Sequence, residues 1–240
     1  MPAEPPVEYR QLKYAAPSGS TEILLVRHGE SAPARPDQPF PSKDGHGDPP
    51  LAPEGHWQAE QLGARLAEQS VHEPISAIYV SSLQRTHQTA APLAARLDLE
   101  PVIELDLREV HLGEWDNGLY RKHASEGHPV ILQAYEEEEW GVIPGAETEA
   151  QLRARVMPVI RRIADDHTDE RVVVVVHGGV IGAILSEVTR SRPWAFMGAD
   201  NGSISHLVAH EGRWILRRFN DTGHLAGELS TETDPPAEMA

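Results

Sequence analysis

The sequence predicts a three-layer α/β/α domain with a mainly parallel central sheet. Two short apolar runs, residues 23–26 and 172–176, are typical of parallel strands that are covered on both faces. The first run leads into Arg27, His28 and Gly29, and the second leads directly into His177 and Gly178. Strand patterns alternate with helical patterns along the chain, and this order places helices on both faces of a parallel sheet.

The composition limits the classes of function. A chain of 240 residues is long enough for one sizeable domain, which we expect over residues 21–226, after an N-terminal arm (1–20) and before a flexible tail (227–240). The absence of cysteine excludes disulfides and thiolate chemistry. The formal net charge of -16 argues against nucleic acid and anionic membranes as partners. No apolar run is long enough for a membrane span or a signal peptide, so we expect a cytoplasmic protein.

The first strand is followed by a long segment and then a helix. Residues 32–50 contain six prolines and two glycines, and we expect a loop without regular structure beside the site. Residues 53–69 have the apolar periodicity of a helix, and Pro53 suits its first turn.

A second strand and helix come next. Residues 77–80 predict a strand, and Ser82 is the expected N-cap of the helix behind it. Pro92 lies inside this helix and should bend it. Residues 101–105 predict a third strand.

The second half of the chain repeats this alternation. The pattern predicts a partly helical segment over residues 116–144 and a helix over 147–167. A strand over 171–176 and a further helix over 180–188 follow, and a hairpin over 203–219 is expected at or near the sheet edge.

Four basic side chains are predicted to meet at one edge of this sheet. Arg27 and His28 follow one strand, Arg85 lies in the first turn of a helix after another, and His177 ends a third. Ligands of open α/β sheets bind beyond the carboxyl ends of the strands. Gly178 opens the next helix, whose free N–H groups and positive dipole end attract anions. Two guanidinium groups, two imidazoles and a helix N-terminus suit a tetrahedral dianion.

On these residues the chain resembles the histidine phosphatase superfamily, also called the phosphoglycerate mutase-like family. The matching segments, in the order of the family, are residues 25–31, 81–90, 107–109 with 113–115, and 176–179, with weaker matches at 51–59, 144–145 and 220–225. The resemblance covers most of residues 22–225, and its strength comes from the joint occurrence of these segments.

The resemblance implies a phosphohistidine mechanism. His28 would be the nucleophile, and Arg27, Arg85 and His177 would hold the equatorial oxygens of the phosphoryl group. Glu109 would protonate the departing oxygen and later activate water. The alternative for Glu109 is a loop carboxylate paired with its neighbour Arg108. By the same implication the enzyme needs no metal and no cofactor.

The substrate side of the site departs from the family. Ala34 stands where many members have an asparagine that helps to hold the phosphoryl group, so Ser31 or a backbone N–H would compensate. The proline-rich segment is also longer than usual. Arg121 and Lys122 could meet an anionic substrate tail.

Three functions remain open. The first is a phosphatase acting on a small phosphorylated metabolite, alone or as a homodimer. The second is a phosphoglycerate mutase. Two observations disfavour it: Gly179 stands where mutases usually have asparagine, and the chain has no clear match to the segment that binds the substrate carboxylate in mutases. The third is a phospho-ligand binding protein without activity, which the joint presence of His28 and Glu109 disfavours. His206 and His210 could share one strand face, but two ligands make a weak metal site.

Overall fold

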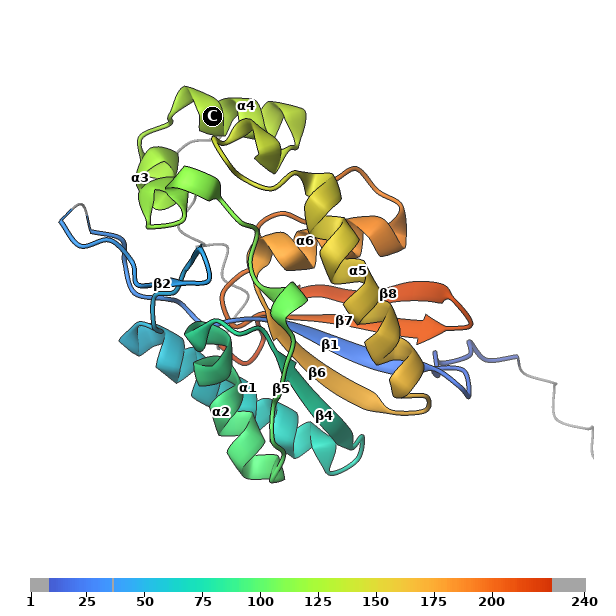
Figure 1. Cartoon of the computed structure of the whole chain (residues 1–240). Coiled ribbons are helices and arrows are strands. Elements are labelled where there is room, and N and C mark those ends of the chain that lie inside the picture. The colour runs from blue at the N-terminus through green and yellow to red at the C-terminus, as the bar shows by residue number, and fades with distance from the viewer. Residues whose placement is uncertain (1–8, 36, 226–240) are drawn as a thin grey trace, which may run out of the picture.

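A computed structural model of the chain describes residues 9–35 and 37–225 and contains a six-stranded sheet (Figure 1). The spatial order of the strands is β5-β4-β6-β1-β7-β8. Their bounds are β1 Thr21–Arg27, β4 Ile75–Val80, β5 Val102–Ile103, β6 Arg171–Val176, β7 Ile204–His210 and β8 Arg213–Asp221. Strands β5, β4, β6 and β1 run parallel, and the β7–β8 hairpin adds two antiparallel strands at one edge. The predicted fold class, including the hairpin at the sheet edge, is confirmed.

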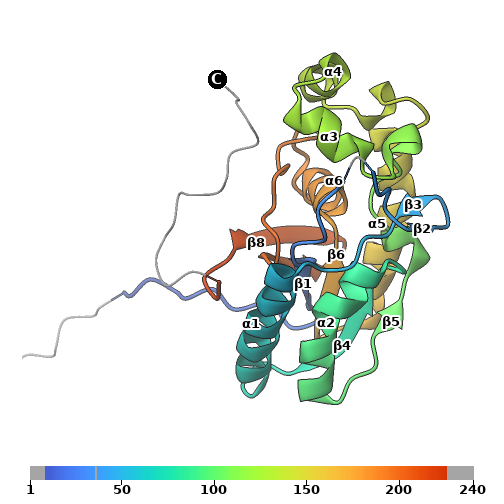
Figure 2. The same ribbon diagram turned by 90° about the vertical axis from the view of Figure 1, so that its left-hand side faces the viewer.

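Successive side chains of the central strands point to opposite faces of the sheet, and the core therefore has two layers. Leu24 and Val26 of β1 pack with the apolar faces of α1 (Pro53–Ser70) and α2 (Gln84–Leu97). Ile23 and Leu25 point the other way, toward α5 (Glu149–Asp166) and α6 (Gly178–Thr189). Figure 2 shows these two helix pairs on opposite sides of the sheet. Burial on both faces is the reason that the strand sequences are continuously apolar.

The start of α2 differs from the prediction. The N-cap is Leu83 rather than Ser82, and the N-cap side chain makes no capping hydrogen bond. The carboxylate of Asp48 instead accepts from the backbone N–H of Gln84 at 2.8 Å. The cap is therefore supplied by a residue 36 positions away, which local sequence cannot indicate. By contrast, α5 begins with a local capping box in which Thr148 and Gln151 bond reciprocally.

The proline-rich segment contains regular structure, against expectation. Ser42–Lys43 (β2) and His46–Gly47 (β3) pair as a two-stranded antiparallel hairpin. Asp44 and Gly45 at its tip have φ values of 51° and 85°. An Asp-Gly pair with two positive φ angles is a favoured two-residue hairpin turn. The local sequence therefore did indicate this hairpin.

A helical region lies beyond the carboxyl edge of the parallel strands. It comprises α3 (Leu119–Ser125), α4 (Pro129–Glu137) and the 3₁₀ turns η1 (Leu105–Leu107), η2 (Gly113–Trp115) and η3 (Trp140–Val142). Figure 1 places α3 and α4 together at one end of the molecule, next to α6. The strand predicted over 101–105 shortens to β5, because the chain turns into η1 at Leu105.

Outside this fold, residues 9–18 of the predicted arm have no helix or strand and are exposed. The predicted tail lies outside the described residues, as do residues 1–8 of the arm. None of the helices in the described ranges is both long and apolar enough to cross a membrane.

Candidate active site

The four basic residues predicted to converge lie together at the carboxyl edge of the parallel strands. Arg27 ends β1 and His28 follows it, Arg85 lies in the first turn of α2, and His177 is the N-cap of α6. The rings of His28 and His177 meet edge to face at 5.1 Å between centroids. Arg85 Nε lies 3.2 Å from His28 Nε2. The parallel direction of β1, β4 and β6 produces this cluster.

The contacts of His28 leave one ring nitrogen available for chemistry. Nδ1 lies 2.7 Å from the carbonyl oxygen of Gly29, which can only accept, so Nδ1 carries the proton. Nε2 then holds the lone pair and accepts from Arg85. Burial, followed by the neighbouring charges of Arg85 and Arg27, holds the pKa of His28 well below its usual value. His28 is therefore a neutral imidazole with its lone pair facing the guanidinium groups.

His177 is fully buried and lies behind the cavity wall. Its Nε2 lies 2.9 Å from Ser81 Oγ, while Nδ1 has no hydrogen-bond partner among the described residues. Burial and then the charge of Arg85 lower the pKa of His177 well below its usual value. Nδ1 is the atom of this ring that is left to contact a ligand.

The two arginines of the cluster are held by the backbone. Arg27 donates to the carbonyl oxygen of Ala199, and its buried Nε has no partner among the described residues. Arg85 Nη1 donates to the carbonyl oxygen of Gly47 at 3.0 Å. Burial lowers the pKa of Arg85 to about 10, so the guanidinium stays charged at neutral pH. Both side chains keep N–H groups for the oxygens of an anion.

Glu109 reaches the same point from an irregular segment between η1 and η2. Its Oε1 accepts from the N–H of Val110 at 3.0 Å, and Oε2 lies 3.5 Å from the N–H of Gly179 at the start of α6. A Cβ at position 179 would lie 2.8 Å from Oε1, so a side chain there would displace the Glu109 carboxylate from this position. Arg108 does not pair with Glu109, as the alternative required, but with Asp44 at 3.3 Å.

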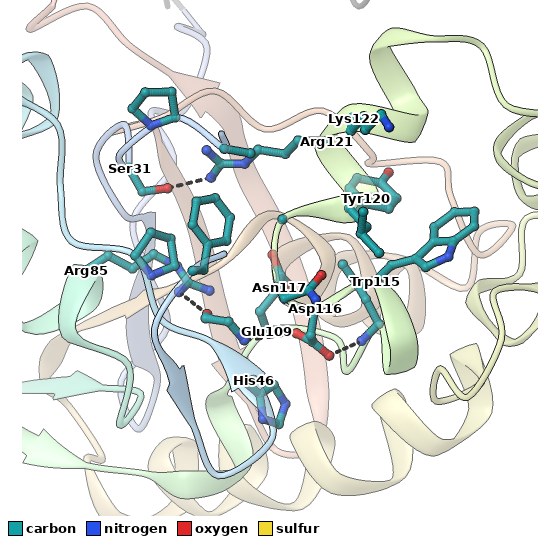
Figure 3. Close-up of a pocket in the computed structure, with 18 of the residues that line it drawn as sticks. Ser31, His46, Arg85, Glu109, Trp115, Asp116, Asn117, Tyr120, Arg121 and Lys122 are labelled. Carbon is teal, nitrogen blue, oxygen red and sulfur yellow. Dashed lines mark hydrogen bonds between the residues drawn. The ribbon is translucent and has the colours of Figure 1, made fainter. Parts of the chain in front are cut away.

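Arg27, His28, Arg85 and Glu109 line a cavity of about 850 Å³, whereas His177 is not among its lining residues. Ser31 and Arg85 lie on one side of it and Trp115 and Tyr120 on the other (Figure 3). Ala34 also lines it, at the position where the family resemblance would place an asparagine.

The predicted substrate-binding residues occupy different places. Arg121 lines the cavity and donates from Nη2 to Ser31 Oγ at 2.7 Å and from Nη1 to the carbonyl oxygen of Ala32 at 2.8 Å. Lys122 is at the rim, 3.9 Å from Glu126. Gly178 is not among the cavity-lining residues and packs against Arg27 instead.

Two polar residues of the site were missed from the sequence. Ser81 directly follows β4 at the carboxyl edge of the sheet. The rule that grouped the four basic residues could therefore also have identified it. Asn201 lines the cavity and donates from Nδ2 to the carbonyl oxygen of His28 at 2.9 Å. It precedes β7, an antiparallel strand whose amino end lies at this edge, so a rule about carboxyl ends could not indicate it.

No group of three or more potential metal ligands occurs in the described part of the chain. Of the two strand histidines considered, His206 pairs with Glu22 at 2.7 Å, and His210 lies 3.9 Å from Glu211.

Comparison with known proteins gives a consistent picture. Residues 23–222 match the histidine phosphatase superfamily (branch 1). The chain is 35% identical over 212 residues to phosphoglycerate mutase-like protein 4 of Arabidopsis thaliana, covering 85% of this chain and 86% of that protein. It is 33% identical over 212 residues to the metal-independent phosphoserine phosphatase of Arabidopsis thaliana, covering 86% and 84%. Among solved structures, mycobacterial glucosyl-3-phosphoglycerate phosphatase superposes with a TM-score of 0.67 at 25% identity, covering 84% of this chain and 99% of that one.

Proposed function

The chain belongs to the histidine phosphatase superfamily, branch 1, and from that premise we propose that it hydrolyses a small phosphorylated metabolite through a phosphohistidine on His28. It is a metal-independent phosphomonoesterase: one relative is named a metal-independent phosphoserine phosphatase, and a structural neighbour is named a glucosyl-3-phosphoglycerate phosphatase. One observation supports the assignment of residues above all others. A neutral buried imidazole, two guanidinium groups and a carboxyl group meet in one cavity.

In the first step the phosphoryl group moves from the ester to the protein. His28 Nε2 attacks phosphorus in line with the ester bond, and the N–P bond forms as the P–O bond breaks. Arg27, Arg85 and Nδ1–H of His177 bind the equatorial oxygens, where charge must be stabilised. Ser81 Oγ donates to Nε2 of His177 in this arrangement, which places the ring proton on Nδ1. Glu109 gives its proton to the departing oxygen, so the product leaves as a neutral alcohol.

In the second step water removes the phosphoryl group. Glu109, now a carboxylate, takes a proton from a water molecule, which attacks phosphorus opposite His28. The P–N bond breaks, its electron pair returns to Nε2, and inorganic phosphate leaves. Both groups are then in their starting states, and no metal or external cofactor enters the balance.

The position of Gly179 supports hydrolysis rather than a mutase reaction. The carboxylate of Glu109 approaches the backbone at this residue, and a side chain there would fill the space. With 3-phosphoglycerate we expect inorganic phosphate and glycerate, and formation of 2-phosphoglycerate would favour the mutase instead.

The substrate-binding roles of Ser31, Gly178, Arg121 and Lys122 stay predictions, and their positions favour Arg121 and Ser31 over the other two. We also propose that the enzyme acts in the cytoplasm, because multiply charged phosphate esters cross membranes poorly and are used where they are made.

Trapping the intermediate tests the assignment of His28. Brief incubation with ³²P-labelled p-nitrophenyl phosphate followed by alkaline denaturation should leave acid-labile, base-stable label on the protein. His28→Ala should abolish the label, and His72→Ala, a change at an exposed histidine, should not. Label that persists in His28→Ala would place the nucleophile elsewhere.

A further inference from the structure

Glu109 has little local support for a group that must transfer a proton. It lies in the irregular segment between η1 and η2, outside any helix or strand. Of its two carboxylate contacts, one is to its own neighbour Val110 and the other, to Gly179, is 3.5 Å long. A proton donor has to be held within about half an ångström of its working position, so something else must fix this backbone.

The backbone around Glu109 is held by Arg155 of α5. From Nη1 the guanidinium donates to the carbonyl oxygens of Asp106 at 2.6 Å and Arg108 at 2.8 Å. From Nη2 it donates to the carbonyl oxygen of Glu109 itself at 2.9 Å. Three backbone carbonyl oxygens within residues 106–109 are thus bonded to one planar group on a helix.

Glu147 completes the arrangement on the other side of Glu109. Its Oε1 accepts from the N–H of His111 at 2.8 Å, and its own N–H donates to the carbonyl oxygen of His111 at 2.9 Å. The two side chains are joined by a bidentate ion pair, with Nε–Oε2 at 3.0 Å and Nη2–Oε1 at 2.5 Å. Their side chains are 22% and 13% exposed, so water competes weakly for these bonds.

We propose that Arg155 and Glu147 form a clamp that positions Glu109 for proton transfer. The clamp touches neither the cavity nor the groups that hold the phosphoryl oxygens, so both are positioning residues. Geometry rather than charge carries the effect, because only a forked, planar donor can reach three carbonyl oxygens and a carboxylate together. The inference rests on the proposed function, in which Glu109 is the acid.

The test compares leaving groups. p-Nitrophenolate departs without a proton, whereas the alkoxide of O-phosphoserine needs one. For Arg155→Gln we expect kcat/KM for O-phosphoserine to fall about 10- to 100-fold, the range for a misplacement of about 1 Å. The rate of the p-nitrophenol burst from p-nitrophenyl phosphate should stay within about threefold of the wild-type rate, and vanadate should inhibit the variant as strongly as it inhibits the wild type. Arg153→Gln is the matched control, since Arg153 lies two residues away on α5 and pairs only with Glu149 and Glu187 in the described structure.

Two further variants keep the clamp falsifiable. Arg155→Lys keeps the charge but not the fork, and we expect it to show the same selective loss. Wild-type kcat/KM for O-phosphoserine in Arg155→Lys would overturn the proposal. So would a loss of kcat/KM in Arg155→Gln that is equal for O-phosphoserine and p-nitrophenyl phosphate. If Arg155→Gln does not fold, Glu147→Gln carries the test, with the same direction and a smaller effect expected.

Glu109→Gln, measured in parallel, separates the clamp from the function on which it rests. A leaving-group effect in Glu109→Gln without one in the Arg155 variants defeats the clamp alone. No leaving-group effect in Glu109→Gln defeats the acid role of Glu109, and the clamp falls with it.

Discussion

His28 is buried and lies close to the positive charges of Arg85 and Arg27. The burial and the charges both disfavour the imidazolium form, and both lower the pKa of the ring. The protein thereby keeps a neutral imidazole, as the proposed mechanism requires of its nucleophile, at pH values where a free histidine is partly protonated. The guanidinium groups that lower this pKa are also the groups positioned to bind the phosphate oxygens.

The pH dependence of the first step should follow the protonation state of His28. Burial and the neighbouring guanidinium groups hold the pKa of His28 well below its usual value, so the lone pair on Nε2 stays available in mild acid. The rate of the p-nitrophenol burst from p-nitrophenyl phosphate, whose leaving group needs no proton, should therefore change by less than about twofold between pH 7.5 and 6. A burst rate that falls about fourfold over this range, as the neutral fraction of a free histidine does, would show that His28 keeps an ordinary pKa.

At the scale of elements, the N-terminus of α2 depends on a residue that is distant in the sequence. Asp48 accepts from the N–H of Gln84, the residue before Arg85, and its carboxylate lies 3.9 Å from the Arg85 guanidinium. The same loop carries Gly47, whose carbonyl oxygen accepts from Arg85. The proline-rich segment therefore both caps the helix and orients an arginine of the site.

Removing the Asp48 cap should weaken the protein and the site together. Asp48→Ala leaves the N–H of Gln84 without its acceptor, and we expect the free energy of unfolding to fall by about 1–2 kcal/mol in urea denaturation. KM for p-nitrophenyl phosphate should rise because the first turn of α2 carries Arg85. Asp48→Asn retains a capping oxygen and should lose less than about 0.5 kcal/mol. Equal losses in the two variants would mean that the charge on Asp48, and not the cap, is what matters.

At the scale of the whole molecule, buried histidines link stability to pH. His28 and His177 have lowered pKa values in the folded state, so below about pH 6.5 the unfolded chain binds more protons than the folded one. Stability contributed by these groups is complete above that pH and is lost as the pH falls. Glu149 acts in the opposite direction, because burial raises its pKa to about 7 and the folded state keeps a proton that the unfolded state releases.

We expect the histidines to dominate the pH dependence in mild acid. Between pH 6.5 and 5 the free energy of unfolding should fall, by at most about 1.4 kcal/mol per pH unit for each histidine. Replacing one of the pair, as in His28→Gln, should reduce the slope, which urea denaturation at several pH values would measure. The carboxylates with strongly lowered pKa values, Glu22 at about 2 among them, contribute only at lower pH. Stability that is flat or rises over this range would contradict the linkage.

The sequence by itself determined the fold class and the four basic residues of the site. Buried parallel strands are continuously apolar, and their carboxyl ends meet at one edge, so Arg27, His28, Arg85 and His177 could be grouped without a structure. The activity followed from a resemblance carried by these same segments, and the family match confirms it.

Only the tertiary structure decided the contacts between segments that are far apart in the chain. The cap of Asp48 on α2, the bond from Asn201 to His28 and the hold of Arg155 on the Glu109 segment join residues 36, 173 and 46 positions apart. None of them leaves a periodic pattern, since each is a single polar bond made in a loop or at a helix end. Hydrophobic periodicity specifies which faces are buried, whereas these bonds depend on the packing that results.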